Sequence, residues 1–125
     1  MDDQIFLLPY LITVIPIFAF CLILTITVEL IVAKSLGVTD NQALLIVVAA
    51  QALTNPIAVF ITSALVDVVA NDVQYWACVI IVELVVIAVE GLIYKLKGVS
   101  RAPWRLSILA NLASVSVGIL VQTLI

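Results

Sequence analysis

Glu83 lies near the middle of an apolar stretch that extends from Tyr75 to Tyr94. A stretch of about 20 such residues is long enough to cross a bilayer as a helix. A carboxylate at that depth costs roughly 2.5–3.5 kcal/mol on insertion scales. The sequence places no Lys, Arg or His at the same depth to neutralise it. The side chain must therefore be protonated, hydrogen-bonded, bound to a cation or exposed to a wet cavity. This pattern predicts a functional carboxyl inside the membrane.

A second acid and a polar stripe accompany Glu83. Glu90 follows seven residues later and shares the same helix face. The last apolar stretch of the chain carries a polar stripe that includes Ser107, Asn111 and Ser114 at helical spacing. Because only a short connection joins the two stretches, we expect Glu90 to lie near Asn111 and Ser107, and Glu83 near Ser114. The sequence thus predicts a site for a proton, a small cation or a polar substrate.

The second apolar stretch carries Gln51, Thr54, Asn55 and Pro56 near its centre. Proline cannot donate a backbone hydrogen bond, and its ring opens the helix around it. The freed carbonyls and the neighbouring polar side chains would supply oxygen ligands at mid-membrane depth. Broken helices with exposed carbonyls at this depth are typical of transporter sites. We expect Asn55 in the site and Gln51 and Thr54 as secondary members.

Each of these features also has a purely structural interpretation. The polar stripe is ordinary in helix packing within membranes, and Pro16 and Pro56 are accommodated kinks in that interpretation. Glu29, in the first apolar stretch, is a further secondary candidate. For Glu29 and Glu90 the alternative is an ion pair with a long basic side chain that reaches down from the membrane surface. The available partners are Lys34, Lys95 and Arg105.

Composition places the chain among membrane proteins. It has 125 residues, of which 66% are hydrophobic and 10% charged, whereas soluble domains have about 45–50% apolar and about 25% charged residues. Stretches this long without period-two alternation predict helices and not strands. We expect an all-α integral membrane fold, a single domain of four antiparallel helices with the second kinked or broken at Pro56. No internal repeat is evident. The expected helices cover residues 5–34, 43–70, 75–96 and 103–125.

The basic residues predict the orientation of the bundle. All five lie at or beside the connections 35–42 and 97–102, whereas Asp2, Asp3 and Asp72 lie at the other side. The positive-inside rule places these two connections in the cytoplasm and both termini outside it, in a cell membrane. The five bases are Lys34, Lys95, Lys97, Arg101 and Arg105.

These observations favour a small transporter or ion-translocating subunit. Four helices make a thin wall around an aqueous pathway, so we expect parallel protomers in a homo-oligomer or a membrane partner subunit. The alternative is a non-transporting subunit of a larger membrane complex. The chain has no His, no Cys cluster and no nucleophile–base motif, so we expect no enzyme activity, cofactor or metal site. Few bases and no soluble module exclude nucleic-acid binding.

Overall fold

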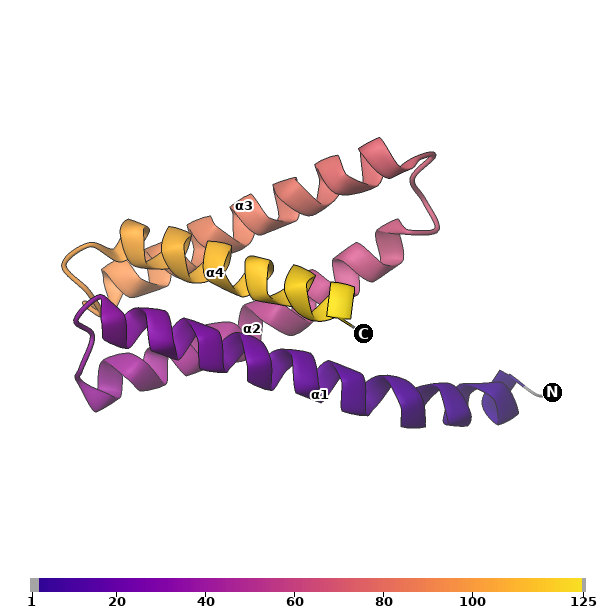
Figure 1. Ribbon diagram of the computed structural model, residues 1–125, viewed down its shortest axis with the longest axis horizontal. Helices are drawn as coiled ribbons and strands as arrows, with labels where there is room; N and C mark the ends of the chain where they lie inside the picture. The colour runs from indigo at the N-terminus through magenta and orange to yellow at the C-terminus, as the bar shows by residue number, and fades with distance from the viewer. Residues whose placement is uncertain (1–2, 125) are drawn as a thin grey trace.

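The computed structural model describes residues 3–124, and it describes the side chains of Pro9, Ile12 and residues 15–124. Asp2 and the side chain of Asp3 lie outside this part. The fold is all-α, and each helix is long and apolar enough to cross a membrane, so the chain is a multi-pass membrane protein. The four helices of the described residues are α1 (Asp3–Ser35), α2 (Asn41–Leu65), α3 (Asp72–Leu96) and α4 (Pro103–Leu124) (Figure 1).

The helices form a bundle in which sequence neighbours run in opposite directions (Figure 1). Each helix packs against two others: α1 against α2 and α4, and α3 against the same two. Across the described residues, α1 is therefore diagonal to α3, and α2 is diagonal to α4. The α1–α2 and α3–α4 connections lie at one end, and the chain termini and the α2–α3 connection lie at the other.

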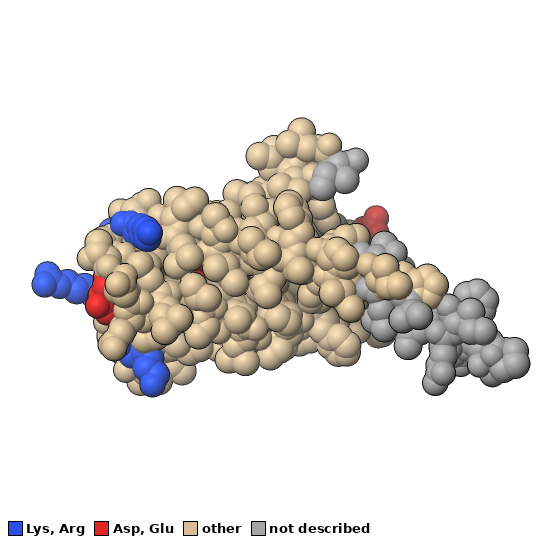
Figure 2. All heavy atoms as spheres, turned by 90° about the horizontal axis from the view of Figure 1, so that it is seen from below, with Lys and Arg blue, Asp and Glu red and all other residues tan. Residues whose placement is uncertain are grey.

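The end with the α1–α2 and α3–α4 connections is the basic end, because the Lys and Arg side chains gather there (Figure 2). Both connections contain a glycine in the left-handed region, Gly37 at φ 93° and Gly98 at φ 64°, which a residue with a Cβ adopts only under strain. Asp40 caps α2, where its carboxylate accepts a hydrogen bond from the Ala43 amide at 3.1 Å.

Burial divides the bundle into two halves. Every buried residue among the described side chains falls within residues 29–54 or 90–111, next to the basic end. We call this part the packed half and the remainder the open half. Pro56 lies inside α2, which continues on both sides of it and ends at Leu65, before the expected residue 70. The kinks at Pro16 and Pro56 stay predictions. The apolar core of the packed half consists of Ala33, Val38, Ala43, Val47, Ala50, Tyr94, Val99 and Leu106.

Candidate functional site

Glu90 is at the centre of a hydrogen-bonded network in the packed half. Its side chain is fully buried. One carboxyl oxygen, Oε1, lies 2.7 Å from the Thr54 hydroxyl of α2, and the other, Oε2, accepts a hydrogen bond from the Asn111 amide of α4 at 2.9 Å. The packing of α3 between α2 and α4 brings these two partners to opposite sides of the carboxyl. Glu90 is therefore bound by both of its neighbouring helices.

The Asn111 side chain is fixed by a second bond. Its amide nitrogen also donates to the Ser107 carbonyl at 2.8 Å, one turn earlier on α4. The Ser107 hydroxyl donates to the Ile87 carbonyl of α3 at 2.7 Å. Ser107 thus joins the two helices through the backbone and does not bind the carboxyl of Glu90. Both amide protons of Asn111 have acceptors, so its orientation beside Glu90 is set.

A second buried carboxyl, that of Glu29 on α1, lies close to Glu90. It is 0% exposed, and neither of its oxygens has a hydrogen-bond partner. The Tyr94 hydroxyl and the Gln51 amide nitrogen are also buried without a partner. Tyr94 interacts electrostatically with both glutamates and with Gln51. Buried polar atoms in native proteins are nearly always paired, so this cluster of unpaired groups is unusual.

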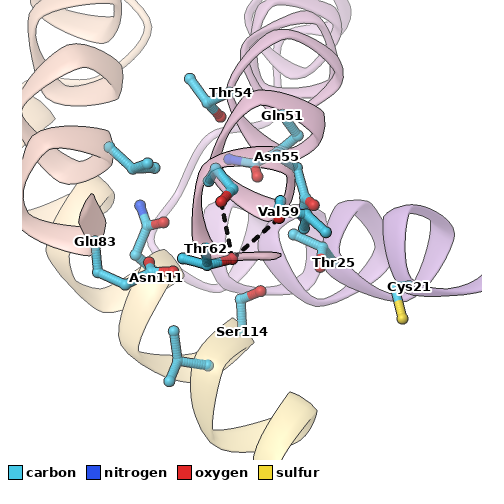
Figure 3. Close-up of a pocket in the computed structure, with 13 residues that line it drawn as sticks. Cys21, Thr25, Gln51, Thr54, Asn55, Val59, Thr62, Glu83, Asn111 and Ser114 are labelled. Atoms are coloured by element: carbon cyan, nitrogen blue, oxygen red, sulfur yellow. Dashed lines mark hydrogen bonds between the residues drawn. The ribbon is translucent and has the colours of Figure 1, made fainter. Parts of the chain in front are cut away.

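A polar cavity of about 200 Å³ adjoins the network on the side away from the basic end. All four helices contribute to its wall. In Figure 3 the side chains of Glu83, Asn111 and Ser114 lie on the α3–α4 side, opposite Asn55 and Thr25. The cavity is also lined by the Glu90 partner Thr54 and by Gln51. The complete lining is Cys21, Thr25, Gln51, Thr54, Asn55, Ala58, Val59, Thr62, Glu83, Val86, Asn111, Ser114 and Val115.

Glu83 lies on the wall of this cavity. Its side chain is half-buried, and no hydrogen bond to it is found among the described residues. Seven residues separate it from Glu90, which places it about 10 Å further along the helix axis. The two carboxyls therefore have different settings. Glu83 faces open polar space in the bundle, and Glu90 is enclosed beyond the end of that space.

The structure brings most of the residues singled out in the sequence into one region. Glu83, Asn55 and Ser114 line the cavity together with Gln51, Thr54 and Asn111, and the last two also contact Glu90. The ion-pair alternative for Glu29 and Glu90 is wrong, because no base among the described residues pairs with either. Sequence reasoning did not single out Tyr94 as a site residue, although its spacing of four from Glu90 places both on one helix face.

No protein-family model, no curated protein and no solved structure matches this chain. What the site can do must therefore follow from its own residues. The carboxyl, hydroxyl and amide oxygens present are hard ligands that suit protons, water and hard cations, and buried carboxyls repel anions. In the described part of the chain, no three His, Cys, Asp or Glu side chains are grouped so that they could hold a metal ion.

Proposed function

We propose that the protein is a small transporter or ion-translocating subunit that moves a proton or a small monovalent cation by way of the Glu90 carboxyl. The observation that carries the proposal is a fully buried acid, without a base among the described residues, at the end of a polar cavity. Ionisable groups within membrane-spanning segments commonly mark ion pathways and proton relays. A purely structural contact would be as well served by a neutral amide.

The Thr54 hydroxyl allows Glu90 to gain or lose a proton without a change of partners. Thr54 Oγ1 lies 2.7 Å from Glu90 Oε1 and 2.9 Å from the Ala50 carbonyl oxygen. A hydroxyl has one proton to donate and can also accept. When Glu90 is ionised, Thr54 donates to its carboxylate. When Glu90 is protonated, its O–H donates to Thr54, and Thr54 donates to the Ala50 carbonyl. Both states are satisfied in one geometry.

The cavity supports access from one side only. Thr54 and Asn111 belong both to its lining and to the Glu90 contacts, so a water-borne ion that fills the cavity comes next to the network. The apolar core of the packed half lies between Glu90 and the basic end. By the positive-inside rule we assign the basic end to the cytoplasm. The cavity would then serve the outer side, and release into the cytoplasm would require the packed half to open.

Assembly is part of the proposal. Large apolar side chains are exposed along all four helices, and lipid or neighbouring helices would cover them. The one-sided charge distribution favours parallel protomers in a homo-oligomer or beside a membrane partner subunit. The alternative is the non-transporting interaction subunit, in which the Glu90 network only fixes how the helices pack.

Flux measurements in proteoliposomes test the proposed function. A gradient of H⁺, Na⁺ or K⁺ is set up across the membrane of vesicles that contain the purified protein. Uptake of the ion is followed with ion-selective dyes. We expect Glu90→Gln to reduce flux at least tenfold, because the amide cannot exchange a proton or carry a charge. Glu83→Gln should raise the cation concentration that gives half-maximal flux, because it removes charge from the cavity wall.

Asp67→Asn is the matched control, since Asp67 is an exposed acid at the other end of the bundle, and its flux should equal that of the wild type. Unchanged flux in Glu90→Gln would remove that carboxyl from the mechanism. If the wild type conducts none of the three ions and instead co-purifies with a stoichiometric membrane protein, the interaction subunit is the correct alternative.

A further inference from the structure

The two buried glutamates occupy matching positions in a short internal repeat, which is not evident among the many apolar residues of the sequence. Glu29 and Glu90 are each followed five residues later by a lysine and eight residues later by the pair Gly-Val. A hydroxyl residue comes next in both segments. The matching pairs are Glu29 and Glu90, Lys34 and Lys95, Gly37 and Gly98, Val38 and Val99, and Thr39 and Ser100.

The repeated residues have the same local structure. The Val38 amide donates to the Ala33 carbonyl at 2.9 Å, and the Val99 amide donates to the Tyr94 carbonyl at 3.0 Å. In both places the glycine amide bonds a carbonyl three residues earlier, which completes the same helix-ending turn, the Schellman motif. Because α1 is diagonal to α3, the α1–α2 and α3–α4 hairpins correspond to each other by a pseudo-twofold axis along the bundle.

The second helices of the two hairpins carry matching polar groups. Gln51 follows Ala50 on α2, and Asn111 follows Ala110 on α4; each has a hydroxyl residue three positions later. Asn111 donates to Glu90. Glu29 is the counterpart of Glu90 in the repeat, and Gln51 holds a place on α2 similar to that of Asn111 on α4, one residue out of register with the repeat. The two halves differ in one respect. Glu90 has Thr54 and Asn111 as hydrogen-bonding neighbours, whereas both carboxyl oxygens of Glu29 and the amide nitrogen of Gln51 have no hydrogen-bond partner.

We propose that one alkali cation binds at the Glu29 half of the repeat, held by the Glu29 carboxylate, the Tyr94 hydroxyl and the Gln51 amide, whose oxygen faces the ion once the amide group is turned by 180°. All three side chains are at least 98% buried, and Tyr94 interacts electrostatically with Glu29, Glu90 and Gln51. One ion satisfies several of these atoms at once, which a proton on one carboxyl does not. Two carboxyls are too few to form a divalent-metal cluster here, and Glu90 already has two hydrogen-bonding neighbours.

This inference names the ion of the proposed function, and it rests on that function for the way the ion reaches the site. Binding itself can be measured without transport. The purified protein in lipid nanodiscs is equilibrated with ²²Na⁺ or ⁸⁶Rb⁺, the latter as a tracer for K⁺, and bound ions are counted by equilibrium dialysis. Choline chloride keeps the ionic strength constant. We expect one saturable ion per chain.

Trp104 gives a second, local signal. It packs against Gly91, the residue after Glu90, and it is one of only two tryptophans in the chain. In a Trp76→Phe background, titration with NaCl or KCl should change the Trp104 fluorescence with the same midpoint as the dialysis curve. Glu29→Gln should weaken binding at least tenfold, and Asp67→Asn should not change it.

If Glu29→Gln does not fold, Tyr94→Phe, which removes only the hydroxyl, should weaken binding severalfold. Dialysis that retains neither ion overturns the proposal and means that water alone fills the site. The proposal is also overturned if only Mg²⁺ or Ca²⁺ is retained, or if both variants bind the ion as the wild type does. Saturable binding without flux leaves the site in place and removes the transport function. If flux survives Glu29→Gln and dialysis detects no bound ion, the transport function stands and the proposed ion site does not exist.

Discussion

The packed half and the open half of the bundle are made of the same four helices, yet they differ in how closely the helices approach. At the basic end, two short connections hold α1 against α2 and α3 against α4, and small residues such as Ala33 and Ala50 are fully enclosed. In the open half no described residue is buried, and a polar cavity separates the helices. The buried acids lie where the two halves meet, which is where an ion would pass from water into protein under the proposed function.

The largest effect should come from the same truncation made in each half of α4. Leu106 is 1% exposed and Leu120 is 58% exposed. Leu106→Ala leaves a cavity among packed helices and should lower the free energy of unfolding by about 2–5 kcal/mol. Leu120→Ala removes a side chain that faces lipid and should change it by less than about 0.5 kcal/mol. Unfolding by SDS in mixed micelles, followed by circular dichroism, measures both. Equal losses would show that the two halves are packed alike.

A glycine in each half provides the second comparison. A Cβ at Gly91 would overlap the indole of Trp104, whereas a Cβ at Gly118 would meet nothing within 4 Å. Gly91→Ala should therefore destabilise by about 1–3 kcal/mol through overpacking. Gly118→Ala should stabilise by about 0.5–1 kcal/mol, because alanine is the better helix former.

The same unfolding assay measures both changes in stability, the loss for Gly91→Ala and the gain for Gly118→Ala. The double variant Gly91→Ala with Trp104→Leu should regain most of the stability that Gly91→Ala loses. If Gly91→Ala is as stable as the wild type, the contact between α3 and the start of α4 is looser than the structure indicates.

Much of this arrangement could be predicted from the sequence, and the reason is chain connectivity. Hydropathy fixes the four helices, and the short connection between α3 and α4 fixes their register, so the approach of Asn111 to Glu90 followed from counting residues. Counting depth from the centre of each apolar stretch favoured Glu83 over Glu90 as the main carboxyl of the site. Burial instead is greatest where the helices converge, and the point of convergence depends on the packing of all four helices.

The electrostatic interaction between Glu29 and Tyr94 was not predictable in this way. Their helices, α1 and α3, are diagonal, and no connection joins them directly. Only the spatial arrangement shows that a residue of α1 and a residue of α3 converge between α2 and α4. The repeat of Gly37-Val38 and Gly98-Val99 was present in the sequence, but five matching positions among many apolar ones became significant only when both segments were seen to form the same turn.

The smallest effects should come from the caps at opposite ends of the bundle, where the two halves are expected to respond in different ways. Asp40 accepts from the Ala43 amide at 3.1 Å, and Asn71 accepts from the Gln74 amide at 2.9 Å. Asp40→Ala should lower global stability by about 1 kcal/mol, because the first turn of α2 contains the buried Ala43 and opens only when the packed half opens.

Asn71→Ala removes an equivalent bond at a helix start that is exposed, since Val73 is 79% exposed. Its cost should therefore appear as local fraying. Hydrogen–deuterium exchange read by mass spectrometry should show faster exchange across residues 72–76 with the global unfolding midpoint nearly unchanged. A global loss as large as that of Asp40→Ala would mean that the open end is coupled to the packed core. Release of an ion through the packed half would then not be independent of the cavity at the other end.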